Sequence, residues 1–174
     1  MKYIAKFEKV SLKEFMNSVK AYNDIYTEEE IANIYKSIEM PKRATEGSAG
    51  YDFVTPLDID VPSLKCNNSN KTKLVPTGIR CKIERGFVLK LYPRSSVGIK
   101  KNLELANTVG IIDSDYYLAD NEGHIKFSLR NNNDEPVKIK ANERVVQGLF
   151  IEHFFAEEED VVSKRSGGFG STNK

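Results

Sequence analysis

From Pro41 onward the sequence shows no helical periodicity and consists of short runs rich in β-branched and aromatic residues. Turns containing glycine, proline or asparagine separate these runs at intervals of roughly ten residues. This rhythm is typical of an all-β barrel or sandwich. The runs are YDFVTPLDIDV, KTKLVPTGIRCKI, FVLKLYPR, LELANTVGII, HIKFSLRN, EPVKIK and RVVQGLFIEHFF.

The first forty residues follow a different pattern. The run MKYIAKFEKV predicts a short strand, and two short amphipathic helices follow it. Capping-box spacing of Ser11 with Glu14 and of Thr27 with Glu30 predicts where the helices begin, and Pro41 ends the second. We expect their apolar stripes to contact the core of the domain rather than a partner. The stripes are Leu12, Phe15, Met16 and Val19, then Ile31, Ile34, Tyr35 and Ile38.

Composition limits the classes of function. A chain of 174 residues suits one domain, with room for an added subdomain. Lys and Arg number 26 against 25 Asp and Glu, so the net charge of +1 argues against bulk electrostatic binding to nucleic acid or membrane. The only cysteines, Cys66 and Cys81, lack metal-ligand spacing, and no apolar run approaches the roughly 18 residues of a membrane span. We expect free thiols in a soluble, cytoplasmic protein.

Several segments contain polar residues that a plain β-barrel does not need. Arg94 with two following hydroxyls in YPRSSVGIK can hold a phosphate chain, together with free backbone N–H groups. The amide of Gln147 interrupts the apolar run RVVQGLF, and Asp113 follows the apolar run GII. Each signal is weak alone, because a lone Asp after such a run is usually a turn residue.

In order, the segments AGYDF, PRSSVG, NTVGIIDSDY, RVVQGLF and GGFGST resemble the five motifs of the trimeric dUTP diphosphatase (dUTPase) family. The resemblance covers about residues 41–172. It implies a mainly β fold, a jelly-roll-type β-barrel with a flexible C-terminal arm, assembled as a homotrimer. It also implies active sites shared between subunits, with the glycine-rich tail of one subunit closing a neighbour's site.

Matched residue by residue, the resemblance implies that Asp113 is the catalytic carboxylate. Its role is to orient and deprotonate the water that attacks the α-phosphorus of dUTP. Asn107 and the backbone around Gly110 resemble the family's uracil-reading hairpin. Tyr116 resembles the residue that lies under the deoxyribose and leaves no room for a 2′-hydroxyl.

The resemblance also implies a phosphate and metal site. Asp52 matches the aspartate that meets Mg²⁺ through ordered water, and a triphosphate needs such a cation as the diphosphate leaves. The positions implied to hold phosphates are Arg94, Ser95, Ser96 and Gln147.

The glycine-rich end of the chain resembles the lid that folds over bound nucleotide. Phe169 is implied to stack on the uracil, while Ser171 and Thr172 bond the γ-phosphate. The family's arginine position is occupied by Lys164, so either this residue or Arg165 meets the γ-phosphate, and we favour Arg165. The glycines allow a close approach to phosphate and keep the arm mobile without ligand.

The sequence therefore predicts three parts: an N-terminal strand and two-helix extension over residues 1–40, a dUTPase-like barrel over 41–160 and a lid arm over 161–174. The role of the extension stays open. YLADNE after Tyr116 is predicted to be a loop insertion. The predicted activity is hydrolysis of dUTP to dUMP and diphosphate; the alternatives are a dCTP deaminase of the same fold and a non-catalytic dUTP-sensing regulator.

Overall fold

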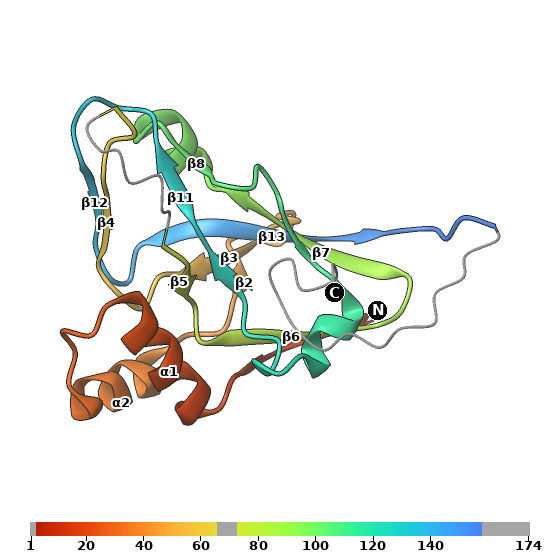
Figure 1. The fold of residues 1–174 in the computed structure, drawn as a ribbon. Coiled ribbons are helices and arrows are strands. Elements are labelled where there is room, and N and C mark those ends of the chain that lie inside the picture. Colours follow the sequence, from red (N-terminus) through yellow and green to blue (C-terminus); the bar gives the residue numbers. More distant parts are fainter. Residues whose placement is uncertain (1–2, 66–72, 158–174) are drawn as a thin grey trace.

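The computed structural model describes residues 3–65 and 73–157, and the fold is mainly β (Figure 1). The predicted strand-rich region is confirmed. Its centre is an antiparallel five-stranded sheet in the order β2-β3-β13-β7-β9. These strands are Lys42–Arg43, Tyr51–Val54, Arg144–Glu152, Phe87–Pro93 and Gly110–Ile112.

Four antiparallel two-stranded ladders complete the β-structure: β1-β6, β10-β5, β11-β8 and β12-β4. Among the described residues these pairings do not join into one closed barrel, although the arrangement agrees with a jelly roll. The strands are β1 (Ala5–Lys9), β4 (Ile59–Val61), β5 (Val75–Pro76), β6 (Ile79–Ile83), β8 (Leu103–Leu105), β10 (Lys126–Phe127), β11 (Leu129–Asn131) and β12 (Val137–Ile139).

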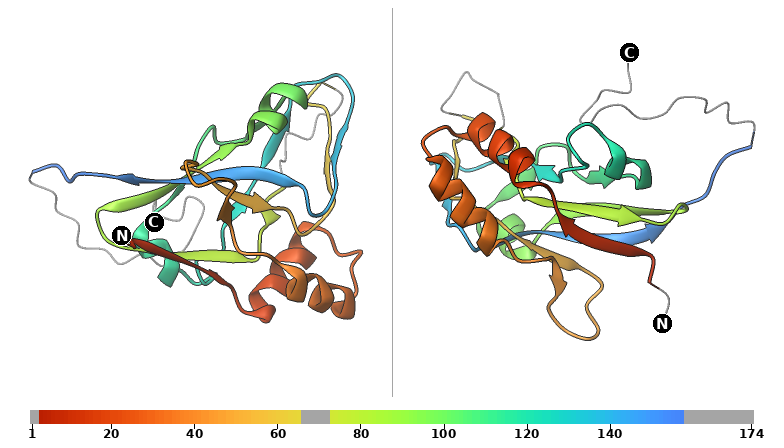
Figure 2. Two further views of the ribbon diagram at one scale, coloured as in Figure 1. Left: turned by 180° about the vertical axis from the view of Figure 1, so that it is seen from behind. Right: turned by 90° about the horizontal axis from the view of Figure 1, so that it is seen from below.

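The N-terminal extension forms the strand and the two helices that the sequence predicts. Helices α1 (Leu12–Tyr22) and α2 (Glu28–Ser37) lie together at one end of the β-structure (Figures 1 and 2). Their apolar stripes contact the core as predicted, and the side chains of Phe15, Val19 and Ile31 are fully buried. Only Leu12 at the start of the first stripe is exposed.

The capping box at α2 forms as predicted. The Thr27 hydroxyl accepts the backbone N–H of Glu30 at 3.2 Å, and the Glu30 carboxylate accepts the N–H of Thr27 at 2.8 Å. At α1 only half of the predicted box forms. The Ser11 hydroxyl accepts the N–H of Glu14 at 3.1 Å, but the carboxylate that accepts the N–H of Ser11 belongs to Glu122.

Two short helical turns follow strands of the central sheet. A π-helical turn, η1 (Ser96–Lys100), follows β7, and a 3₁₀ helix, η2 (Ser114–Leu118), follows β9. Strand β13 runs through the middle of the molecule, and residues 153–157 after it extend away from the body (Figures 1 and 2). None of the helices in the described ranges has the length and apolar character needed to span a membrane.

Candidate active site

Strand β13 brings three separate sequence motifs to neighbouring positions. Gln147 pairs with Asp52 on β3 and with Tyr92 on β7, so these residues share one row across the sheet. Arg94 follows the end of β7, where its backbone N–H donates to the carbonyl of Val145 at 3.0 Å. The fold thus gathers Asp52, Arg94 and Gln147, as the sequence predicts for parts of one site.

The Asp52 carboxylate is the centre of this cluster. Its side chain is 8% exposed and pairs with two arginines: Arg94 Nε lies 2.9 Å from Oδ1, and Arg144 Nη1 lies 3.2 Å from Oδ2. A nearly buried carboxylate needs such charge-assisted partners. Asp52 therefore orients the Arg94 guanidinium, a role that the sequence analysis did not assign to it.

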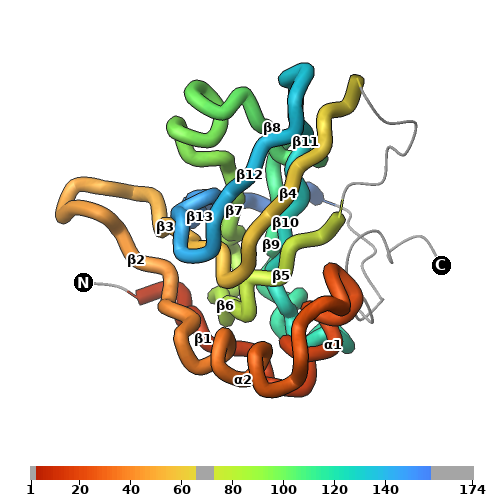
Figure 3. Tube along the Cα trace, turned by 90° about the vertical axis from the view of Figure 1, so that its left-hand side faces the viewer, coloured from red at the N-terminus to blue at the C-terminus, as the bar shows by residue number. Residues whose placement is uncertain are grey.

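A pocket of about 560 Å³ opens beside the ion pair. The loop between β2 and β3, which Figure 3 shows reaching out from the body, forms one wall, and β7 and β13 supply the floor. The lining combines small apolar residues with polar groups, as ligand sites generally do. The lining residues are Ala44, Ser48, Ala49, Gly50, Asp52, Tyr92, Arg94, Gln147 and Leu149.

The Gln147 amide is fitted closely into this pocket. Its Nε2 donates to the carbonyl of Pro93 at 3.5 Å. A Cβ atom at Gly50 would lie 2.7 Å from Gln147 Oε1, so a side chain at position 50 would displace the Gln147 amide from its present place. The glycine of AGYDF thus allows the loop backbone to lie against the amide of the fourth motif.

The two serines after Arg94 lie at the start of η1, and both are exposed. The N–H groups of Val97 and Gly98 both donate to the Arg94 carbonyl at 2.9 Å, which folds the chain sharply after the arginine. Ser95 and Ser96 directly follow Arg94 in the chain and are exposed to solvent, and their role in binding phosphate stays a prediction.

Asp113 lies elsewhere. It is the exposed residue before η2, directly after Ile112 of β9. Ile112 pairs with Leu89, so Asp113 lies opposite Val88, six residues before Arg94. At about 3.4 Å per residue, about 20 Å of strand separate Asp113 from Arg94 within one chain. Neither Asp113 nor Asn107 lines the pocket.

The predicted uracil-reading hairpin is not a β-hairpin. Asn107 is exposed in the turn between β8 and β9, but β8 pairs with β11 and β9 pairs with β7. The turn is compact: the N–H of Thr108 donates to the Leu105 carbonyl at 2.9 Å, and the φ angle of Thr108 is 65°. Gly110 is buried against Leu91. A Cβ atom added at Gly110 would lie 3.0 Å from the Cβ of Leu91.

Tyr116 is buried, with 4% exposure. Its hydroxyl donates to the carbonyl of His124 at 2.9 Å and accepts from the Asn121 amide at 2.8 Å. A ring held this firmly can form a rigid floor under a ligand, and it can offer that ligand only a small part of its surface.

The remaining predicted site residues lie outside the described residues. They are Phe169, Arg165, Ser171 and Thr172, and the same holds for Lys164 and the predicted lid boundary at residue 161. Cys66 also lies outside, whereas Cys81 is a buried free thiol whose pKa is raised by burial to about 12.

The sequence analysis missed two residues that organise polar groups. Arg144 begins the quoted run RVVQGLF, and its spacing of three residues from Gln147 was the available signal. His124 is fully buried and contacts α1, and a lone histidine in the run HIKFSLRN gave no signal. A second cavity, of about 490 Å³ between the end of α1 and β4, contains none of the predicted site residues.

The chain is similar to known proteins over most of its length. The family model described as dUTPase matches residues 36–173. A deoxyuridine 5′-triphosphate nucleotidohydrolase of Lactococcus lactis is 45% identical over 148 residues, which is 82% of this chain and 95% of that protein. One from Fusobacterium nucleatum is 35% identical over 80% of this chain and 92% of its own length.

A solved structure extends the likeness to the fold. The dUTPase of Streptococcus mutans superposes with a TM-score of 0.63 at 35% identity, covering 87% of this chain and 98% of the other. The dUTPase of phage phi11 of S. aureus is 15% identical and shares the fold, with a TM-score of 0.63 over 97% of this chain and 99% of the other. With a family model that spans most of the sequence and relatives of this similarity, the chain belongs to the dUTPase family.

Proposed function

We propose that this protein is an enzyme that hydrolyses dUTP to dUMP and diphosphate. The observation that carries the proposal is the Arg94–Asp52 pair at 2.9 Å, beside a 560 Å³ pocket in a chain of the dUTPase family. The same activity is named for its Lactococcus lactis relative.

Arg94 is the principal phosphate ligand in this proposal. Asp52 pairs with the Nε of Arg94. No other described residue pairs with the Arg94 side chain, so its two Nη groups remain for anionic oxygens. A guanidinium fixed in orientation binds phosphate oxygens in a defined geometry. The Gln147 amide and the hydroxyls of Ser95 and Ser96 add donors on the same side.

Mg²⁺ would be bound in this site together with the dUTP substrate. The described residues contain no group of three His, Cys, Asp or Glu that could cage a metal, and both Asp52 oxygens already bind arginines. This donor set fits a cation held by substrate phosphates and water, which is common for Mg²⁺. Asp52 would meet it through water. A relative, the phage phi11 dUTPase, is described as coordinating a structural Mg(II) ion.

Asp113 supplies the general base. A carboxylate one hydrogen bond from water can take its proton as the water attacks the α-phosphorus. The water must stand about 3–3.5 Å from that phosphorus, so the base and the phosphate ligands must lie around one triphosphate. Within one chain they are about 20 Å of strand apart, which supports a homotrimer whose sites take Arg94 and Asp113 from different subunits.

The base and sugar side of each site then comes from the turn at Asn107, the backbone at Gly110 and the Tyr116 ring. The C-terminal arm, with Phe169 over the uracil and Arg165, Ser171 and Thr172 at the γ-phosphate, is proposed to come from a further subunit. Residues 161–174 are thus a lid on the barrel of residues 41–160.

Turnover of a nucleotide panel tests the activity. Diphosphate release is measured with each dNTP and with UTP, in Mg²⁺ and in EDTA. We expect hydrolysis of dUTP alone, with discrimination of roughly 10⁴-fold, because a mismatched base leaves buried polar groups unpaired. Ammonia released from dCTP would indicate the deaminase, and tight dUTP binding without turnover would indicate the regulator.

Subunit mixing tests the shared site separately. Arg94→Ala and Asp113→Asn are each expected to be inactive alone, with Asp113→Asn still binding a non-hydrolysable dUTP analogue. When the two variants are unfolded, mixed and refolded together, some sites receive both native residues and activity returns. Absence of recovery, in trimers confirmed by light scattering, would mean that one chain supplies both residues.

A further inference from the structure

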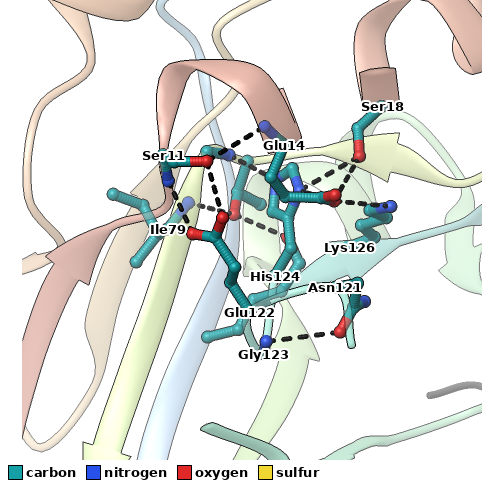
Figure 4. Close-up of polar contacts among 12 residues, drawn as sticks. Ser11, Glu14, Ser18, Ile79, Asn121, Glu122, Gly123, His124 and Lys126 are labelled. Carbon is teal, nitrogen blue, oxygen red and sulfur yellow. Dashed lines mark hydrogen bonds and ion pairs between the residues drawn. The ribbon is translucent and has the colours of Figure 1, made fainter. Parts of the chain in front are cut away.

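The N-terminus of α1 is tied to the segment that follows Asp113. Glu122, from the predicted insertion after Tyr116, accepts the N–H of Ser11 at 2.7 Å and its hydroxyl at 2.6 Å (Figure 4). In this way Glu122 takes the place that the predicted capping box gave to Glu14. The helix start therefore depends on a residue 111 positions away.

Glu14, released from the cap, turns into the protein toward His124. Its Oε1 lies 3.0 Å from His124 Nδ1, 2.7 Å from the Ser18 hydroxyl and 3.5 Å from Lys126 Nζ (Figure 4). Burial opposes ionisation of Glu14, but the hydrogen bonds from His124 and Ser18 outweigh it and lower the pKa of the carboxyl. One carboxylate thus joins α1 to the barrel.

The hydrogen bonds of the His124 ring define its tautomer. The backbone N–H of Gly78 donates to Nε2 at 2.8 Å, so Nε2 carries no proton and the neutral ring holds its hydrogen on Nδ1. Nδ1 then donates to Glu14. With zero exposure of its side chain, the ring is held between α1 and the turn that leads into β6.

The same residue holds Tyr116. The His124 carbonyl accepts the Tyr116 hydroxyl at 2.9 Å, and Asn121 donates to that hydroxyl at 2.8 Å. A Cβ at Gly123, where φ is 69°, would lie 2.6 Å from the carbonyl oxygen of Tyr116. The loop therefore packs directly on the backbone of η2, and a side chain at position 123 would push the two apart.

The next residue, Tyr117, is fixed by the N-terminal strand. Its hydroxyl donates to Glu8 of β1 at 2.6 Å, and the Arg80 guanidinium lies 4.3 Å from its ring centre. The hydrogen bond from Tyr117 is the largest cause that lowers the pKa of Glu8 to about 2. Strand β1 and helix α1 thus hold the same short segment from two sides.

From these contacts we propose that the N-terminal extension is a positioning element for Tyr116, acting through His124, and that it sharpens selection of deoxyribose over ribose. The inference rests on the proposed function, since it needs Tyr116 under the sugar. A ring excludes a 2′-hydroxyl only if it cannot move away. The Glu14–His124 contact fixes the His124 carbonyl, which accepts the Tyr116 hydroxyl. Weakening that contact should therefore let the Tyr116 ring move under the sugar.

The test compares Glu14→Ala with Glu14→Gln and with Thr27→Ala. Glu14→Ala removes the acceptor of His124 Nδ1, whereas Glu14→Gln keeps an oxygen there. Thr27→Ala breaks the capping box of α2 and weakens the same extension without contacting His124. The measured quantity is the ratio of kcat/KM for dUTP over UTP, with the binding ratio of the two non-hydrolysable analogues alongside.

We expect Glu14→Ala to lower this ratio by about tenfold, because small displacements near a reacting substrate have large kinetic effects. Glu14→Gln and Thr27→Ala should retain the ratio. An unchanged ratio in Glu14→Ala, with a Tm decrease like that of Thr27→Ala, would reduce the extension to a structural role. If Glu14→Ala does not fold, Ser18→Ala and Glu122→Ala take its place under the same criterion.

The analogue binding ratio separates this inference from the proposed function. A wild-type protein that fails to hydrolyse dUTP would reject the activity. The positioning inference would still be decided, because the binding preference for the deoxy analogue either falls in Glu14→Ala or does not.

Discussion

Two carboxylate clusters in this protein use similar chemistry in opposite surroundings. Asp52, 8% exposed, pairs with Arg94 and Arg144 beside a pocket. Glu14, 15% exposed, binds His124 and Lys126 against the inner side of α1. The first cluster borders space that a ligand can fill, and the second is enclosed by protein. An ion pair therefore indicates a binding site only when an accessible hollow adjoins it.

The residue that pairs with each carboxylate, arginine beside the pocket and histidine in the enclosed cluster, matches the difference in surroundings. An arginine stays charged at every physiological pH and keeps donors for phosphate while Asp52 orients it. A buried histidine is neutral here and serves as a shaped link between two elements. Breaking each cluster should consequently have opposite effects, on catalysis in the first case and on stability in the second.

The largest effect is expected from Arg94→Ala. Loss of the fixed guanidinium removes charge stabilisation of the phosphates, and kcat/KM for dUTP should fall by about 10²–10³-fold. Asp52 keeps Arg144, so the Tm should change little. Diphosphate release and thermal unfolding measure the two quantities. Turnover like that of the wild type would remove Arg94 from the site.

His124→Ala should show the reverse profile. Truncation leaves a cavity and strips Glu14 and the Gly78 N–H of a partner, at a cost of about 3 kcal/mol in the free energy of unfolding. Hydrolysis of dUTP at low temperature should stay within about tenfold of the wild type. Urea unfolding provides the measurement, and a loss below about 1 kcal/mol would show that the cluster does not hold the extension.

The pH dependence of stability should also distinguish the clusters. Burial lowers the pKa of His124 below its ordinary 6.5, although the hydrogen bond to Glu14 opposes the shift. The unfolded chain therefore binds the proton more readily, so stability is full above about pH 6.5 and falls as the pH decreases below it. The charged groups facing the ring are Glu14, Lys126 and Glu122.

Urea unfolding between pH 7.5 and pH 5 measures how steeply the free energy of unfolding changes with pH. His124→Ala should reduce this slope. Persistence of the full slope in His124→Ala would assign it to other groups, since Glu14, whose pKa is lowered, loses its contribution only as the pH falls further.

The smallest effect is expected from Arg144→Ala. This arginine is 51% exposed, and such a pair contributes at most about 1 kcal/mol, or about fivefold. Asp52 would still orient Arg94, so KM for dUTP should rise by a few-fold while kcat stays nearly constant. A fall in kcat as large as that of Arg94→Ala would mean that both arginines contact the phosphates.

The sequence predicted what local patterns encode. Alternating runs predicted the strands, and Thr27 with Glu30 predicted a capping box that forms in full. The resemblance to the dUTPase motifs predicted that Asp52, Arg94 and Gln147 would share a site. A family resemblance indicates which distant residues lie close together, whereas periodicity indicates only local structure.

What the sequence missed depends on contacts between distant residues. Glu14 has the correct spacing for a cap, yet it binds His124, 110 positions away. The turn at Asn107 looks like a hairpin, but its flanking strands pair with β11 and β7. In both cases tertiary partners outcompete the local interaction, and no window of neighbouring residues contains that information.

The shared row of Asp52, Gln147 and Tyr92 limits how the gene can change length. Deleting or inserting one codon within β13 would turn Gln147 to the opposite face of the sheet and separate the phosphate ligands at once. The register between β13 and β3 already shifts once, between Arg144 and Val146. Insertions or deletions in this strand should therefore abolish activity, whereas those in connecting loops should be tolerated. A scan of single-codon deletions would measure this difference.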